Sequence, residues 1–124
     1  MKIAIPTDDK TLNSNICASF GRAPYYLIYD TDTKESKFIE NSAAQSAGGA
    51  GIKAAQIISD SNADAVIAPR CGENAADVLK QSNINIFKSK SADIAENLSA
   101  FAAKELSLLD EIHSGYHGRN GNER

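Results

Sequence analysis

The chain has 124 residues and a mass of 13.2 kDa, which leaves room for one domain. Its net charge of −3 and its pI near 5.3 argue against a general nucleic-acid binder, because such proteins are usually basic. No apolar run reaches the roughly 20 residues that a membrane span needs, and the N-terminus has too few apolar residues for a signal peptide. We therefore expect a cytoplasmic protein with reduced cysteines that binds neither nucleic acid nor a membrane.

The first part of the chain predicts one strand and a β-hairpin. Residues 2–6 form a short strand that a proline stops, and the polar residues after it are typical of a loop. Aromatic and β-branched residues predict a strand over 25–30. Turn residues follow it and lead into a return strand over 36–40.

Helices and strands then alternate. A glycine-rich segment leads into a helix over about 50–61, and Asn62 is suited to a left-handed conformation at its end. A short apolar run over 63–69 predicts a buried parallel strand, and a helix over 73–81 follows it. A further buried strand is expected at 84–87.

The last helix is expected to be long. Ser91 is a candidate N-cap, and Asp93 favours a helix start. Apolar residues then continue at helical spacing, so the pattern predicts a last helix that extends over 103–112, unless it breaks near Leu106 and Ser107. Residues 113–124 have no period and predict a disordered tail.

The resulting order is β-β-β-α-β-α-β-α, which predicts an α/β protein with a five-stranded mixed sheet flanked by helices. Open sheets of this kind bind ligands beyond the carboxyl ends of their parallel strands. Three unusual segments are candidates for that region: the loop after the first strand up to Arg22, the glycine-rich segment at 48–51, and the turn from Arg70 to Asn74.

The two cysteines have a functional and a structural interpretation. Cys71 precedes a helix, where the positive end of the helix dipole and the neighbouring Arg70 favour a thiolate. Thiolates are the soft ligands that select iron–sulfur and copper-type centres, and Cys17 lies in a separate loop that is able to approach Cys71. The alternative is that both are small buried apolar residues, as free cysteines often are.

The glycines and Arg22 also allow two interpretations. Gly48, Gly49 and Gly51 either present backbone N–H groups to an anion at a helix start or allow a tight turn with close packing. They are not a Walker phosphate loop, because no Gly-Lys-Ser/Thr follows them. Arg22 is suited to pair with an anionic ligand or with a local carboxylate.

Acidic residues and histidines give weaker signals. Asp8 and Asp9 follow the first strand, where a divalent-metal nuclease places carboxylates, and Glu73 is the one possible partner at another strand end. The alternative is a solvated polar loop. Glycines flank His113 and His117, so we expect histidines of a flexible tail rather than a metal site, and no further histidine exists for a catalytic pair in the core.

Residues 20–30, Phe-Gly-Arg-Ala-Pro-Tyr-Tyr-Leu-Ile-Tyr-Asp, closely resemble a signature of the dinitrogenase iron–molybdenum cofactor biosynthesis family. This family includes NifX and the C-terminal domain of NifB. The Gly-Gly-Ala-Gly segment at 48–51 and the Gly-Glu-Asn-Ala turn at 72–75 fall where the family has its other motifs, and the resemblance covers about residues 1–102. It implies a ribonuclease H-like fold and a non-catalytic nitrogenase accessory protein that binds or carries a metal–sulfur cluster.

The resemblance implies an Fe–S, Mo–Fe–S or Mo–Cu–S cluster, exchanged with cluster donor or acceptor proteins by a monomer or weak homodimer. Some carriers of the family have a histidine near the Phe-Gly-Arg motif, where this chain has Ala18 and Ser19. A covalent ligand would therefore come from a cysteine. Otherwise the arginines and backbone N–H groups would hold the cluster.

We expect the cluster in a groove between the three segments. The candidate site residues are Cys17, Arg22, Gly48, Gly49, Gly51, Arg70, Cys71 and Asn74, with Cys17 and Cys71 as candidate metal ligands. The alternatives are a divalent-metal-dependent nuclease on the same fold and a regulatory interaction module that binds no cluster.

Overall fold

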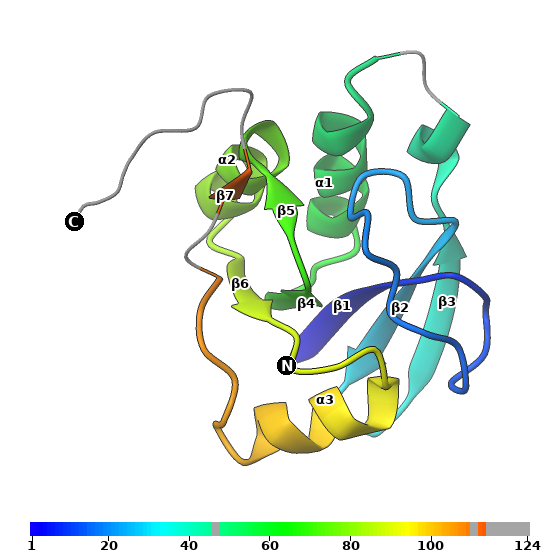
Figure 1. Cartoon of the computed structure of the whole chain (residues 1–124), viewed down its shortest axis with the longest axis vertical. Coiled ribbons are helices and arrows are strands. Elements are labelled where there is room, and N and C mark those ends of the chain that lie inside the picture. Colours follow the sequence, from blue (N-terminus) through cyan, green and yellow to red (C-terminus); the bar gives the residue numbers. More distant parts are fainter. Residues whose placement is uncertain (46–47, 110–111, 114–124) are drawn as a thin grey trace.

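The computed structural model describes residues 1–45, 48–109 and 112–113. A five-stranded sheet forms its centre, in the order β3-β2-β1-β4-β6 (Figure 1). The strands are β1 (Lys2–Thr7), β2 (Tyr25–Asp30), β3 (Ser36–Glu40), β4 (Ala65–Ala68) and β6 (Asn85–Lys88). β2 is antiparallel to β1 and to β3, whereas β4 pairs in parallel with β1 and with β6. The predicted α/β class with a five-stranded mixed sheet is confirmed.

Helices cover both faces of the sheet. α1 (Ala50–Asp60) and α2 (Glu73–Gln81) lie side by side on one face, and α3 (Ile94–Ala102) lies on the other (Figure 1). The chain also contains a 3-10 helix, η1 (Ser42–Gln45), and two short strands that pair in parallel, β5 (Cys71–Gly72) and β7 (Ile112–His113). These three small elements were not predicted. No helix of the described residues has the length and apolarity needed to cross a membrane.

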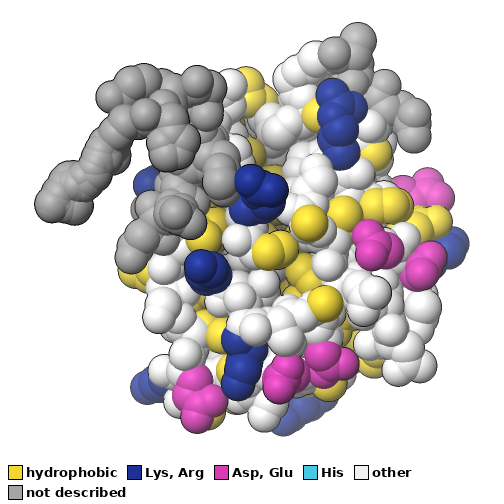
Figure 2. Space-filling model, in the orientation of Figure 1, with side chains coloured by type: hydrophobic (Ala, Val, Ile, Leu, Met, Phe, Trp, Pro, Cys, Tyr) yellow, Lys and Arg dark blue, Asp and Glu magenta, His cyan; other side chains and the backbone are white. Residues whose placement is uncertain are grey.

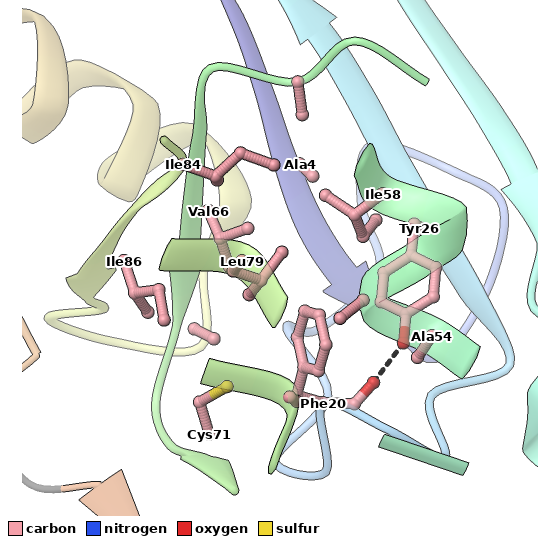
Figure 3. Close-up of a cluster of buried hydrophobic side chains, with 14 of the residues drawn as sticks. Ala4, Phe20, Tyr26, Ala54, Ile58, Val66, Cys71, Leu79, Ile84 and Ile86 are labelled. Carbon is pink, nitrogen blue, oxygen red and sulfur yellow. Dashed lines mark hydrogen bonds between the residues drawn. The ribbon is translucent and has the colours of Figure 1, made fainter. Parts of the chain in front are cut away.

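The alternation of side chains along β1 divides the core into two clusters. Ala4 faces α1 and α2, whereas Ile3 and Ile5 face α3. Figure 3 shows the first cluster, in which strand and helix side chains interdigitate. The strand residues that it buries are Ala4, Tyr26, Ile28, Val66, Ala68, Cys71 and Ile86, and the α-helix residues are Ala54, Ala55, Ile58, Ala75, Ala76 and Leu79.

Each helix ends at a residue in the left-handed conformation. These residues are Asn62 with φ 63°, Asn83 with φ 61° and Lys104 with φ 60°. The prediction for Asn62 is confirmed. At the end of α3 the Lys104 N–H donates to Phe101 O at 3.0 Å and the Glu105 N–H donates to Ala100 O at 2.8 Å. This pair of bonds is the Schellman motif, which closes the helix.

The predicted extension of the last helix over 103–112 is therefore wrong. After α3 the chain turns back and pairs with β6, where Lys88 N–H donates to Ser107 O and Leu109 N–H donates to Ile86 O, each at 2.8 Å. Leu109 is buried in the cluster below α1 and α2. Pairing with the free edge of β6 satisfies backbone groups that a helix here would leave unpaired.

Two details at the ends of the domain also differ from the predictions. The N-cap of α3 is Asp93, whose carboxylate accepts from the Glu96 N–H at 2.7 Å, rather than Ser91. β1 continues one residue beyond the proline that was expected to stop it. The predicted tail lies outside the described residues, apart from the backbone of His113.

Candidate functional site

A groove of about 670 Å³ opens where α1 and α2 begin. Its walls come from residues 18–22, 49–52 and 70–75. These are parts of the three segments that the sequence placed beyond the strand ends. Of the eight candidate site residues, the groove is lined by Arg22, Gly49, Gly51, Arg70, Cys71 and Asn74. Cys17 and Gly48 are not among the lining residues.

Close backbone packing joins the three segments. A Cβ atom on Gly21 would lie 3.0 Å from Gly51 Cα, which is closer than side chains normally approach a backbone. A Cβ on Gly51 would in turn lie 3.5 Å from Ala75 Cβ, at the start of α2. Small residues at these positions therefore let the signature loop, the start of α1 and the start of α2 touch one another.

The glycines at 48–51 differ in their roles. Gly49 is the N-cap of α1 and has a left-handed φ of 68°, which favours glycine. Gly51 is the residue that Gly21 approaches closely, as described above. A Cβ on Gly48 would meet nothing within 4 Å. Backbone conformation therefore explains Gly49, whereas a Cβ on Gly51 would make only an ordinary van der Waals contact and one on Gly48 would make none.

Two residues behind the groove hold the signature loop in place. The buried Asn41 side chain donates to Gly21 O at 3.0 Å and to Ala23 O at 2.8 Å. The Tyr26 hydroxyl donates to Phe20 O (Figure 3). Tyr26 belongs to the signature run, but sequence reasoning missed Asn41. Its place just after a strand is typical of a loop, and only the fold brings it to residues 21 and 23.

Both helices that begin at the groove lack a side-chain cap. The N-caps of α1 and α2 are Gly49 and Gly72, and neither helix start has a side-chain cap hydrogen bond. α3, on the opposite face of the sheet, has the Asp93 carboxylate in that position. First-turn N–H groups have no partner within their own helix, so two helix starts present donors and partial positive charge to the groove.

Two arginines add full positive charge. Arg22 is exposed, and its guanidinium donates to Ala44 O at 3.0 Å, which fixes it beside η1. Arg70 is exposed between β4 and β5. In Figure 2 the acidic side chains lie along the right and lower parts of the visible face, whereas basic ones lie in its upper part as well as in its lower part. The groove is thus chemically suited to an anion.

Cys71 is not the thiolate that its position before a helix predicted. Its side chain is 1% exposed, and burial raises the pKa of its thiol to about 11 against the weaker opposing effect of Lys80. Figure 3 shows its sulfur among the apolar side chains of the cluster. The dipole argument fails because the loss of hydration outweighs it.

Cys17 is half-buried behind the same loop. Burial raises the pKa of its thiol, and a hydrogen bond to Asp8 acts in the same direction, whereas the Ser19 N–H opposes them. The pKa of Tyr26 is also raised, mainly by burial and then by both cysteines. The two thiols therefore lie near one hydroxyl, and both are neutral at pH 7.

The acidic residues that the structure describes do not form a metal centre. Among the residues that the structure describes, no three His, Cys, Asp or Glu side chains gather to hold a metal ion. Glu73 lines the groove, but Asp8 and Asp9 do not. The carboxylate set that a divalent-metal nuclease needs is therefore missing from the described part of the chain.

The mixed sheet and its groove define a small α/β protein with a site suited to an anion. The chain belongs to the dinitrogenase iron–molybdenum cofactor family, whose model matches residues 1–104. The resemblance found in the sequence is thereby confirmed. An uncharacterised protein of Methanocaldococcus jannaschii, MJ0580, is 31% identical over 113 residues, which cover 89% of this chain and 92% of that protein.

Solved structures share the fold. The apo form of the orange protein from Desulfovibrio gigas superimposes with a TM-score of 0.83 over 88% of this chain and 92% of its own, at 22% identity. A Thermotoga protein named as a NifB protein of the DUF35 family superimposes with a TM-score of 0.79 over 93% of this chain and 98% of its own, at 29% identity.

Proposed function

We propose that this chain binds a metal–sulfur cluster in the groove and carries it as cargo, without catalysing a reaction on it. The observation that carries the proposal is the convergence of two uncapped helix starts and two arginines on one groove, in a member of the iron–molybdenum cofactor family. The cargo would be an Fe–S, Mo–Fe–S or Mo–Cu–S cluster, as a precursor or relative of the nitrogenase cofactor.

The proposed binding is electrostatic. Arg22 and Arg70 would supply counter-charge, and first-turn N–H groups and the Asn74 amide would donate to the cluster sulfides. Cys71 is among the lining residues, but its side chain is 1% exposed and packs in the core, with a thiol pKa of about 11, so the thiol would be neutral at pH 7 and turned away from the cluster. Ligation by Cys71 would first require loss of that proton.

The proposal extends to the setting of the protein. The antiparallel β2 within the order β3-β2-β1-β4-β6 supports a ribonuclease H-like fold, and the family match over 1–104 supports a cluster-binding domain of about 1–102. We further propose a cytoplasmic monomer or weak homodimer that exchanges its cargo with cluster donor and acceptor proteins. Neither the nuclease nor the cluster-free interaction module is favoured.

Anaerobic reconstitution tests the proposal. The chain is incubated with sulfide and ferrous iron, with sulfide and molybdate, or with sulfide, molybdate and copper, and is then desalted. We expect a protein-bound visible chromophore in at least one mixture. Arg22→Gln combined with Arg70→Gln should lose at least 10-fold in retained metal, because both cations are removed. Lys37→Gln on β3 is the matched control. A colourless wild-type protein in every mixture would refute the proposal.

A further inference from the structure

Glu73 places a negative charge in a groove otherwise suited to an anion. It is the first residue of α2, it is exposed, and it lies in the groove wall between Gly72 and Asn74. Among the described residues of the lining it is the single carboxylate, against the two arginines. The formal side-chain charge of the described lining is therefore +1 rather than +2.

Helix stability offers a simpler explanation for an acidic residue at this position. A carboxylate in the first turn interacts favourably with the positive helix end, and α2 has no side-chain cap. That explanation concerns folding alone. The location of Glu73 has a second consequence, because the same charge that stabilises α2 also repels any anion that approaches this helix start.

We propose that Glu73 limits how tightly the groove holds its anionic cluster, so that the cargo can be released to an acceptor. The inference rests on the proposed function. Binding draws on the arginines and the helix N–H groups, and Glu73 offsets part of that attraction. A groove with a formal side-chain charge of +2 would retain a sulfide-rich anion longer than one with +1, and its transfer would be slower.

Asp77 provides a matched control. It lies one helical turn beyond Glu73 on α2, is exposed and does not line the groove. Glu73→Gln and Asp77→Asn each remove one negative charge from the same helix while keeping the shape of the side chain. Glu73→Asp keeps the charge and shortens the side chain, so it separates charge from shape.

The probe is tetrathiomolybdate, a coloured sulfide-rich dianion, and its dissociation constant is measured by anaerobic equilibrium dialysis. We expect Glu73→Gln to bind it roughly 5- to 10-fold more tightly at low salt, as expected for one charge facing a dianion across about 8 Å of water-like dielectric. Release on dilution should slow by a similar factor. Asp77→Asn and Glu73→Asp should stay within about twofold of wild type.

Salt provides an internal check. The Debye length falls from about 30 Å at 0.01 M to about 3 Å at 1 M, so the advantage of Glu73→Gln should largely vanish at 1 M salt. Thermal unfolding of each variant shows whether the fold is intact. If Glu73→Gln does not fold, Glu73→Asp is compared with wild type instead. A gain in affinity with Glu73→Asp, which keeps the negative charge, would contradict the inference.

Each remaining outcome is decisive. Weaker binding by Glu73→Gln would make Glu73 a ligand or positioning group and overturn the inference. Equal effects of Glu73→Gln and Asp77→Asn would also overturn it, because the effect would then be one of net charge. If wild type binds neither tetrathiomolybdate nor any reconstituted cluster, the proposed function itself fails and the inference falls with it.

Discussion

Gly21 is the residue at which a single methyl group tests the packing of the groove. An ideal Cβ at this position would lie 3.0 Å from Gly51 Cα, 3.1 Å from Gly51 N and 3.5 Å from the Ala50 carbonyl carbon. All three neighbours are backbone atoms at the start of α1, so no side chain can rotate to make room. The backbone of Gly21 itself is not in the left-handed region, so an alanine there is strained by contact alone.

We expect Gly21→Ala to lower the free energy of unfolding by about 1–3 kcal/mol, the usual cost of one added group in a packed site. The loop and the start of α1 must separate by a few tenths of an ångström, which also displaces Arg22 and the first N–H groups of the helix. The variant should remain folded at 25 °C, so a loss of stability alone would leave its affinity for tetrathiomolybdate unchanged. We expect the affinity to fall, because the substitution displaces groups of the groove.

Gly48→Ala is the matched control. A Cβ there meets nothing within 4 Å, and Gly48 is not among the residues with a positive φ. Its stability should stay within about 0.5 kcal/mol of wild type, or rise slightly because the unfolded chain loses freedom. Urea unfolding followed by circular dichroism measures both variants. Equal stability and equal affinity of the two would refute the packing account of the groove.

Three other predictions follow from the same structure. Asn41→Ala should cost about 3 kcal/mol in urea unfolding, because the bonds to Gly21 O, Ala23 O and the Ala43 N–H disappear, whereas exposed Asn85→Ala should cost under about 0.5 kcal/mol. Cys71 has a thiol pKa of about 11 against a reference of 9.0, so it should be alkylated at least roughly 100-fold more slowly at pH 7 than an unperturbed thiol. The free energy of unfolding should fall as pH rises from 9 toward 11, because the thiol ionises first in the unfolded chain. Fast alkylation of the folded protein would contradict this. Leu109→Ala should cost about 2–4 kcal/mol and its exposed neighbour Leu108→Ala far less, and equal thermal melts of the two variants would contradict the burial of Leu109 beside β6.

Local sequence patterns predicted the residue ranges of those elements whose own apolar residues determine which side faces the core. The β2–β3 hairpin has a dense aromatic and β-branched run and a turn of fixed chemistry, and both strands match their predicted ranges. α1 and α2 match within a residue, because their apolar spacing agrees with the face that they bury. The rule that ligands bind beyond parallel strand ends predicted that the loop after β1 and the turn after β4 come together, whereas it did not place the glycine segment, which follows the antiparallel β3.

The end of α3 could not be predicted because two structures compete for the same apolar residues. Leu106 and Leu109 fit a continued helix by spacing, but they also fit a strand beside β6, whose edge needs backbone partners. Lys104 takes the left-handed conformation that usually calls for glycine or asparagine, so the sequence carries no stop signal there. Pairing with β6 decides the outcome, and it is visible only in three dimensions.

Cys71 illustrates the same limit for chemistry. The sequence places it at a helix start beside an arginine, and both neighbours favour a thiolate. The thiol lies either at the start of α2 or in the core, depending on how β5 packs against the rest of the domain. No local sequence pattern determines that packing. Since it faces the core, burial dominates and the thiol stays protonated.

The family motifs acquire a common physical meaning from this arrangement. The three motifs meet at small residues: Gly21 lets the signature loop approach the backbone of Gly51 at the start of α1, and a Cβ on Gly51 would lie in ordinary contact with Ala75 at the start of α2. Close backbones bring two helix starts to one groove, and a helix start offers N–H donors whatever its side chains are. The motifs therefore need no histidine or thiolate to make an anion site, which accounts for a groove with Ala18 and Ser19 at its rim and a neutral Cys71 in its lining. In such a site the charged side chains adjust the affinity, and Glu73, Arg22 and Arg70 are the described lining residues through which that adjustment can act.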